Sequence, residues 1–500
     1  MGKTSRYIAK SFIWGASSML LDAVIKFVSI PILLNYLGKD NYGLITLAYS
    51  INAYLQLLDM GINTGAVKYF SEWIQQKKMD VLDSVARTSI TFYSIIGLIN
   101  ALVLIIVSIW GISAFSLSPE QIIIFRKMLL ILSLFAVINW STSVFNQLLT
   151  ANESISIVQQ LNILRSVLSL GLIFLTIHWK LDIIQYFLYT IILNSIIIIP
   201  YYIKTKKDKL IKSFLPAFDW KNFSIIFKYS LAIISMGIFQ ITASRSRPII
   251  LSIYSDKGMG IIADYKVMET ITLFIISIGG MFSSIFLPKT AKMLADNDRT
   301  AINNFAYNGT LYTSIIVVYL CIPFALCSSE LLEVYLGESY TNLAPWLNLW
   351  IFTILGFLHS TPVHSIILSV GKTRPIVFCT AFSCIVSIII NIFLCKQLGV
   401  GSAIIGYSAY ILIQMSFYYL YFHEVIGLNS WKIFKAFFKP TFLGVLSYLI
   451  IWAFKIPISS PFIRAVVKCC LWAVTYSGCL LLFRLVNLQL IKNMAFGRES

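Results

Sequence analysis

Two arginines stand out in "FQITASRSRPIILSIY", the stretch from Phe239 to Tyr254. Arg245 and Arg247 are permanent cations among residues that are otherwise apolar or small. A guanidinium group offers a planar fork of donors that matches phosphate oxygens, and it stays ionised when water is removed. The pair therefore indicates binding of a phosphate or another acidic group. Packing against buried carboxylates is the alternative interpretation.

The composition favours a lipid bilayer as the solvent of this chain. Of its 500 residues, 58% are hydrophobic and 12% are charged, whereas a soluble domain carries about a quarter charged residues. The net charge of +18 is typical of a membrane protein with basic cytoplasmic loops. Nucleic-acid binding is disfavoured because no soluble basic domain is available to carry it.

The residue types that bind metals show no ligand spacing. The eight cysteines fall mostly within apolar runs, which favours buried free thiols. His359 and His364 are five positions apart, whereas paired helical ligands are usually four apart. The "DND" of Asp296 to Asp298 has the form of a transferase metal motif, but no globular domain surrounds it. We expect no metal, no cofactor and no catalytic centre.

Apolar stretches long enough to cross a bilayer recur along the whole chain. A spanning helix needs about 20 mostly apolar residues, and continuous runs favour helices over the alternating strands of a barrel. We therefore predict an all-α integral membrane protein with about fourteen transmembrane helices. They lie near residues 11–36, 42–63, 88–112, 122–149, 157–178, 182–203, 223–253, 260–287, 307–327, 345–369, 374–394, 400–422, 436–455 and 462–484.

The placement of lysine and arginine predicts the orientation. Basic loops such as "KTKKDKLIKSF" and "WKIFK" alternate with "SAFSLSPEQ" and "SSELLEVYLGESYTN", which contain neither residue. The positive-inside rule then puts both termini in the cytoplasm. The first apolar segment is interpreted as a retained helix, because no small-residue cleavage site follows it. The outer segment near residues 328–344 has room only for a small amphipathic helix.

An internal repeat relates the first and seventh predicted helices. "PILLNYLGKDNYGLI" and "PIILSIYSDKGMGII" align without a gap, pairing Pro31 with Pro248 and Gly43 with Gly260. Six helices separate the copies, so both point the same way, as in transporters with parallel repeats. We predict two pseudo-symmetric six-helix lobes, residues 1–208 and 209–425, around a central cavity. Residues 426–500 would add two helices and a cytoplasmic tail. Gene duplication without a transport role is the alternative.

Several stretches resemble one family of membrane proteins. "YLGKDNYGLITLAYSINAYLQLLDMGINTGAVKYFSEW" resembles the opening of lipid-linked polysaccharide flippases, with its "LG…YG" turn and later "LLD.GI". "GGMFSSIFLPKTAKML", "LLEVYLGESYTNLAPWL" and "SVGKTRP" resemble later parts of the same proteins. The chain thus resembles the Wzx-type O-antigen flippase branch of the multidrug/oligosaccharidyl-lipid/polysaccharide exporter superfamily.

The resemblance implies a bacterial inner-membrane transporter that is not an enzyme and needs no cofactor. Its substrate would be an undecaprenyl-diphosphate-linked oligosaccharide, moved from the cytoplasmic to the periplasmic leaflet by alternating access. The two additional helices would provide a groove for the lipid tail. A polysaccharide polymerase and a chain-length regulator are candidate partners, and a proton or a sodium ion is a candidate coupling ion.

Charged residues inside the predicted spans form the candidate site. Arg245 lies roughly 12 Å below the outer end of its helix, close to the midplane of a core about 30 Å thick. Two arginines facing lipid there would cost roughly 5–7 kcal/mol, so we expect a cavity that binds the diphosphate or an acidic sugar. The two are about 200° apart on a helix, and Arg245 is the residue expected to face the cavity.

Further cation candidates are Arg165 and Lys26, and candidate charge partners or ion-coupling groups are Asp22, Asp264, Glu269, Lys266 and Asp59. Asp22 and Lys26 could instead neutralise each other at i, i+4.

Other functions fit the residues less well or equally well. A peptidoglycan lipid-precursor flippase would fit the fold and the charges equally well. A multidrug or cation antiporter of the same superfamily would favour carboxylates over arginines in its cavity. A membrane polysaccharide polymerase or ligase would want a large periplasmic loop, which the sequence lacks. A purely structural scaffold is disfavoured by the repeat and the buried cations.

Overall fold

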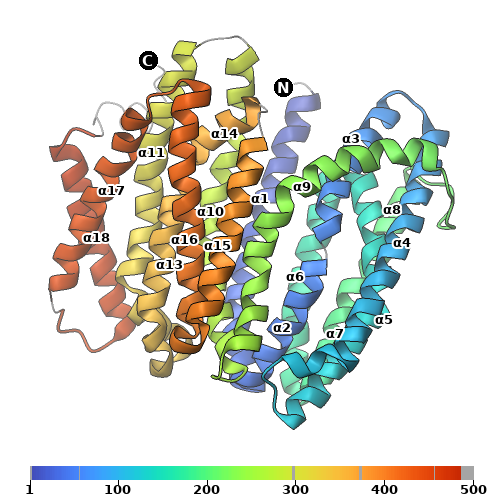
Figure 1. The fold of residues 1–500 in the computed structure, drawn as a ribbon, viewed down its shortest axis with the longest axis horizontal. Coiled ribbons are helices and arrows are strands. Elements are labelled where there is room, and N and C mark those ends of the chain that lie inside the picture. The colour runs from blue at the N-terminus through green and yellow to red at the C-terminus, as the bar shows by residue number, and fades with distance from the viewer. Residues whose placement is uncertain (1–2, 56, 296–298, 371–373, 455, 486–500) are drawn as a thin grey trace. The chain divides into compact units, whose positions relative to one another are not determined.

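The computed structural model describes residues 3–55, 57–295, 299–370, 374–454 and 456–485, with some side chains inside these ranges left undescribed. This part of the chain is helical throughout, with eighteen α helices joined by short turns (Figure 1). The chain divides into two compact units. Unit 1 contains residues 1–270 and 388–403, and unit 2 contains residues 271–387 and 404–500.

Unit 1 contains the first nine helices and the start of the tenth. Their bounds are α1 Lys3–Leu37, α2 Lys39–Leu55, α3 Leu57–Gln75, α4 Met79–Ile109, α5 Pro119–Ala151, α6 Ile155–His178, α7 Ile183–Ile196, α8 Ile198–Lys207, α9 Trp220–Tyr254 and α10 Gly260–Ala295. Helix α9 packs against α2, α3 and α4. Its packing places the stretch that carries Arg245 and Arg247 beside the start of α2.

Unit 2 contains the later helices, and three of the helices run from one unit into the other. The bounds are α11 Arg299–Leu326, α12 Ser328–Leu336, α13 Ala344–Leu358, α14 Thr361–Val370, α15 Arg374–Leu398, α16 Val400–Tyr421, α17 Ser430–Ala453 and α18 Pro461–Leu482. The helices that cross the boundary are α10, α15 and α16. Within unit 2, α17 packs against both α11 and α18 (Figure 1).

Local sequence signals explain several helix starts. Ser118 caps α5 with a complete capping box, in which its side chain accepts from the Gln121 amide and its own amide donates to the Gln121 side chain. Asp182 and Gln185 make the same reciprocal pair at the start of α7. Such boxes satisfy two backbone donors that a helix start leaves unpaired. They fix where two of the long apolar helices begin.

Burial follows from packing apolar faces within each unit. In unit 1, Phe70, Tyr93, Trp140, Phe145 and Phe223 belong to one buried cluster. In unit 2, a Cβ atom added at Gly444 would lie 2.4 Å from a Val318 side-chain carbon, which shows how closely α17 approaches α11. Many large apolar side chains elsewhere are exposed. Exposed apolar surface of this extent suits a protein surrounded by lipid.

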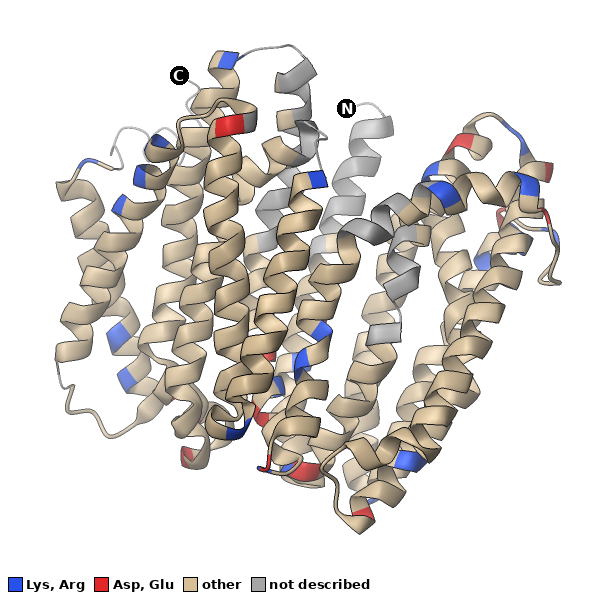
Figure 2. Ribbon diagram, in the orientation of Figure 1, with Lys and Arg blue, Asp and Glu red and all other residues tan. Residues whose placement is uncertain are grey.

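Eleven of the described segments are long and apolar enough to cross a membrane. The chain is therefore an all-helical, multi-pass membrane protein. Figure 2 shows most coloured charges near helix ends, with long uncharged stretches between them. Two predicted single helices are each two helices here, because α7 and α8 separate at Ile197, and α13 and α14 separate at residues 359–360. The short outer helix predicted within residues 328–344 is α12.

Candidate functional site

The turn between α9 and α10 packs tightly against the turn between α1 and α2. A Cβ atom added at Gly43 would lie 2.2 Å from the Met259 carbonyl oxygen, and one added at Gly260 would lie 3.0 Å from Asp40 Oδ1. Glycine is needed at position 43, because a side chain there would collide with the backbone of the facing turn, whereas a side chain at position 260 would have to displace the side chains of Lys39 and Asp40. These are the two glycines that the sequence repeat aligns, so the two copies of the repeat contact each other at equivalent turns.

Above this turn, α9 presents its two arginines differently. Arg247 is buried, with 5% of its surface exposed, and its Nη1 donates to the hydroxyl of the fully buried Tyr265 at 3.5 Å. Arg245 is exposed. The helical spacing of about 200° accounts for the difference, since the two side chains leave α9 on nearly opposite sides.

Two carboxylates on α10, Glu269 and Asp264, each have a lysine partner. Glu269 Oε2 is 2.7 Å from Lys266 Nζ, and Asp264 Oδ1 is 2.8 Å from Lys39 Nζ at the start of α2. The charges of both Arg245 and Arg247 also act on the Glu269 carboxylate. These four cations and two carboxylates carry a formal charge of +2. We call this set of residues, with Tyr265, the α9–α10 cluster.

A smaller polar group joins α1 to α6. Asp22 and Lys26 form an ion pair at 2.6 Å, and the Ser166 hydroxyl donates to Asp22 Oδ1 at 3.0 Å. Arg165 is half-buried, and its charge acts on the hydroxyl of Tyr201. No carboxylate among the described side chains forms an ion pair with Arg165. Arg165 is thus a second positive position in unit 1.

The remaining polar residues singled out in the sequence have other settings. The Asp59 side chain and residues 296–298 lie outside what the structure describes. His359 stacks on Phe437 with ring centroids 3.8 Å apart, and its Nε2 is 2.9 Å from the Tyr419 hydroxyl. His364 packs edge-on against Tyr418. Within the described residues, no three potential ligands gather into a metal site.

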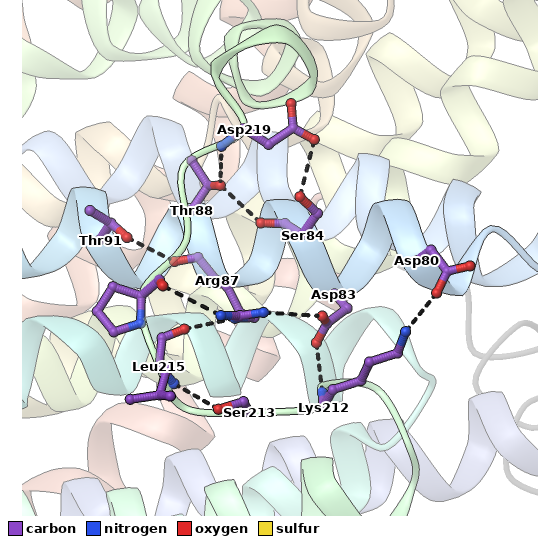
Figure 3. A network of polar contacts seen from close by, with 11 residues as sticks. Asp80, Asp83, Ser84, Arg87, Thr88, Thr91, Lys212, Ser213, Leu215 and Asp219 are labelled. Carbon is purple, nitrogen blue, oxygen red and sulfur yellow. Dashed lines mark hydrogen bonds and ion pairs between the residues drawn. The ribbon is translucent and has the colours of Figure 1, made fainter.

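The connection between α8 and α9 is fastened along α4, as Figure 3 shows. Asp83 Oδ1 accepts from the Lys212 amide at 2.6 Å, and Arg87 Nε donates to the Leu215 carbonyl at 2.7 Å. At the start of α9, the Asp219 amide donates to Thr88 Oγ1 at 2.8 Å. These contacts fix the beginning of the helix that carries the arginines.

Charges in the same connection reinforce this fastening. Lys212 Nζ is 2.7 Å from Asp80 Oδ1, and this hydrogen bond and its charge raise the pKa of Lys212. Hydrogen bonds, led by the one from the Asn222 side chain, lower the pKa of Asp219. The Asp219 carboxylate therefore stays ionised as the N-cap of α9, where negative charge stabilises a helix.

An apolar groove of about 360 Å³ lies between α16 and α17 in unit 2. Leu412, Met415 and Tyr419 line it from α16. Trp431 and Phe434 line it from α17, where a stacked aromatic series continues along the helix to Phe438 and Phe442. Trp431, Phe438 and Phe442 are largely exposed. Apart from Ser416 and Ser430, the residues that line the groove are apolar or aromatic.

Sequence reasoning missed two members of the α9–α10 cluster, Tyr265 and Lys39. Tyr265 lies between Asp264 and Lys266 in the sequence. Its position between two charged residues of an apolar helix could have identified its hydroxyl as part of the cluster. Lys39 pairs with a residue 225 positions away, and only the aligned repeat turns hinted that the start of α2 meets the start of α10.

Comparisons with solved structures place the fold among known transporters. The structure of a lipid II flippase, MurJ, in an inward closed conformation superposes with a TM-score of 0.73 at 13% identity, covering 94% of this chain and 98% of that one. An outward-facing multidrug resistance MATE family transporter of the MOP superfamily gives a TM-score of 0.56 at 16% identity, covering 85% and 97%. A MOP superfamily transporter from Pyrococcus furiosus gives 0.52 at 14% identity, covering 85% and 96%.

Sequence comparison identifies the family. No curated protein sequence matches the chain. The family model described as polysaccharide biosynthesis protein matches residues 8–294, which is more than half of the chain. Its members are membrane transporters rather than enzymes, in agreement with the fold. The chain therefore belongs to the polysaccharide biosynthesis protein family.

Proposed function

We propose that this protein is a flippase that moves an undecaprenyl-diphosphate-linked oligosaccharide, such as an O-antigen repeat unit, from the cytoplasmic to the periplasmic leaflet of a bacterial inner membrane. The observation that carries the proposal is the positive charge of the α9–α10 cluster. Arg245 is exposed although it lies well inside a helix of a membrane protein. A cation exposed there needs a water-filled passage or an anionic ligand.

The diphosphate of the substrate supplies the matching charge. Arg245 can grip phosphate oxygens with a planar fork of donors and stays ionised without water. Arg247 is held by Tyr265 and is placed to strengthen the positive potential rather than to reach the ligand. Lys266 neutralises Glu269 and Lys39 neutralises Asp264. The exposed guanidinium of Arg245 is thus available to the substrate, which lowers the cost of moving an anion through hydrocarbon.

The lipid tail and the headgroup would take different routes. The polyprenyl chain stays in the hydrocarbon region, and the groove between α16 and α17 offers it an apolar surface. The sugars and the diphosphate pass along the cationic interior. Two lobes, residues 1–208 and 209–425, open this passage alternately to each side of the membrane, while residues 426–500 add the last helix pair and the tail. Both termini lie in the cytoplasm in this arrangement.

Net movement also needs a driving force. Equal binding in both conformations shifts no equilibrium. A proton or sodium gradient would supply the bias, and in the intact pathway a polymerase with its chain-length regulator would withdraw the product.

A peptidoglycan-precursor flippase is the second candidate, because the MurJ structure superposes over 94% of this chain. Its substrate has the same diphosphate and polyprenyl parts, so the α9–α10 cluster would serve either molecule. The two candidates differ in the sugar, and hence in which intermediate accumulates when the protein is removed. Multidrug export is less well supported, since a cationic drug would be repelled by the cluster.

The test is depletion of the protein in its native cells, followed by analysis of lipid-linked sugars in each leaflet. We expect intact oligosaccharide intermediates to accumulate in the cytoplasmic leaflet, loss of surface glycan, and recovery of both on re-expression. Accumulation of peptidoglycan precursor with cell lysis would favour the second candidate. Unpolymerised units on the periplasmic side would identify a later step instead and overturn the proposal.

A further inference from the structure

Two cysteines distant in the sequence meet in unit 2. Cys327 is buried at the N-cap of α12, and Cys469 is half-buried on α18. Their Sγ atoms are 3.5 Å apart, and the Cys327 thiol also lies 3.4 Å from the Ala465 carbonyl oxygen. A disulfide bond is about 2.05 Å long. The sulfurs are thus already in contact, and small side-chain rotations would bring them to bonding distance.

Cys327 lies where one candidate span ends, and Cys469 is the ninth residue of another, Pro461–Leu482. Cys327 directly follows Leu326, the last residue of the span Arg299–Leu326, and the next span begins at Glu338. The segment between them contains no lysine or arginine, and the proposed orientation puts it on the outer face. Thiols exposed to the periplasm of bacteria are oxidised, whereas those in the cytosol are kept reduced. The inference therefore rests on the sidedness used in the proposed function.

A cluster of charges holds α12 against α18 beside these sulfurs. Glu330 Oε1 accepts from Lys468 Nζ at 2.5 Å and from Arg464 Nε at 3.1 Å, while Arg464 Nη2 is 3.3 Å from Glu333 Oε2. The side chains of Arg464 and Glu333 are about one-third exposed, at 29% and 32%. They give the region polar, hydrated surface through which a small disulfide can approach. These residues, which we call the α12–α18 cluster, lie beside the two cysteines and give the more exposed one, Cys469, a polar approach.

We propose that Cys327 and Cys469 form a dithiol pair that a disulfide donor on the outer face converts to a disulfide, joining α12 to α18. Cys469, the more exposed thiol, attacks as thiolate and displaces one donor thiol, which leaves a mixed disulfide. The Cys327 thiolate then attacks the Cys469 sulfur and displaces the second donor thiol. The donor disulfide is reduced to two thiols by the two electrons of the cysteine pair, and the two cysteine protons end on those thiols.

The disulfide would close a long loop, since 142 positions separate the two cysteines. Cross-links of long loops stabilise mainly by restricting the unfolded chain. Oxidation should therefore raise the melting temperature of the protein by about 5 °C. It would also attach the last helix pair covalently to the part of unit 2 that follows α11.

The test is a thiol assay on the full-length protein, taken from cells under non-reducing conditions with free thiols blocked at once. Labelling with a maleimide polymer after reduction should reveal two additional thiols, and mass spectrometry should detect a linked peptide containing Cys327 and Cys469. Cys327→Ser and Cys469→Ser should each abolish both signals. Cys470→Ser, which changes the exposed neighbour on α18, should leave them unchanged.

A second experiment tests whether the two cysteines can form a disulfide, independently of the side of the membrane on which they lie. Reduced, purified protein in detergent is treated with oxidised glutathione, which reaches both faces. The linked peptide and the rise in melting temperature should appear in the wild type and not in Cys469→Ser. Their absence would overturn the proposal without touching the flippase function. A linkage that forms in detergent but never in cells would overturn the outer placement of the pair, and with it the proposed orientation.

Discussion

The two charge clusters of this protein use similar residues for different ends. The α12–α18 cluster has two cations and two carboxylates, and Glu330 at its centre is buried with 4% of its surface exposed. The α9–α10 cluster has four cations and two carboxylates, and one of its arginines is exposed. The first is balanced within the protein, whereas the second carries a surplus of positive charge.

This difference separates charges that hold the fold from charges that are available to a ligand. A buried carboxylate with two cationic donors is costly to remove, because the remaining cations lose their counter-charge. A surplus cation costs little to remove in terms of folding but takes away affinity for an anion. Mutations in the α12–α18 cluster should therefore lower stability more than transport. Mutations of the exposed arginine in the α9–α10 cluster should lower transport more than stability.

The largest effect is expected from Arg245→Glu, which reverses the charge at the exposed arginine. Flipping should fall by about 100-fold, because a charged hydrogen-bonding partner is lost and a repulsive group is added. Arg245→Ala should lose about tenfold, and Arg245→Lys should retain more activity than alanine. The measurement is leaflet transfer in proteoliposomes. Arg126→Ala, which removes another exposed arginine of a membrane helix, is the control and should transport normally.

Removing the centre of the balanced cluster should lower stability instead. Glu330→Ala leaves Lys468 and Arg464 without their shared carboxylate and should lower the free energy of unfolding by about 3 kcal/mol. Chemical denaturation in detergent measures this change. Glu338→Ala, at an exposed position nearby, should change stability by less than about 0.5 kcal/mol. A Glu330→Ala protein of unchanged stability would contradict the structural role of the cluster.

The balanced cluster should also make stability depend on acid. Burial raises the pKa of Glu330, but hydrogen bonds and charges from Lys468 and Arg464 outweigh burial and lower it overall. The stabilisation is therefore fully present above the unfolded-state pKa of about 4.3 and is lost as the pH falls through the lower folded-state value. As the pH falls from about 5 to about 3, the melting temperature of the wild type should fall more than that of Glu330→Gln. Parallel curves would contradict this assignment.

The smallest effect is expected from Tyr265→Phe in the α9–α10 cluster. It removes the hydroxyl that accepts from Arg247 at 3.5 Å and should cost about 1 kcal/mol of stability. Flipping by the folded fraction should stay within about threefold of wild type, since Arg245 remains. A loss as large as that of Arg245→Ala would show that Tyr265 contacts the substrate itself.

Much of the fold was predictable because apolar run length is a local signal. The all-helical membrane class and most helix positions follow from it. The breaks at Ile197 and residues 359–360 were missed because the prediction followed run length, although Pro200 and Pro362, near the starts of α8 and α14, were usable markers. The predicted span ended near residue 63, whereas α3 continues to Gln75. The charged and polar residues at the end of α3 had been assigned to a loop.

Most residues of the α9–α10 cluster could be singled out from the sequence, but their pairing could not. Arg245, Arg247, Asp264, Lys266 and Glu269 were found because charge inside an apolar helix is rare. Partners such as Lys39 for Asp264, or Arg464 for Glu330, come from distant helices and depend on packing that no local pattern records. The spacing of Arg245 and Arg247 predicted that their side chains point in nearly opposite directions. Only the structure shows that Arg245 is the exposed one and Arg247 the buried one.

The most direct test of the surplus positive charge is ligand binding by purified, folded protein. The dissociation constants of undecaprenyl diphosphate and of the uncharged undecaprenol are measured for wild type and Arg245→Ala in the same detergent. We predict that the diphosphate binds at least about tenfold more weakly to the variant, while undecaprenol binds equally to both. Equal affinity of the two proteins for the diphosphate would contradict a role for this arginine in recognising phosphate.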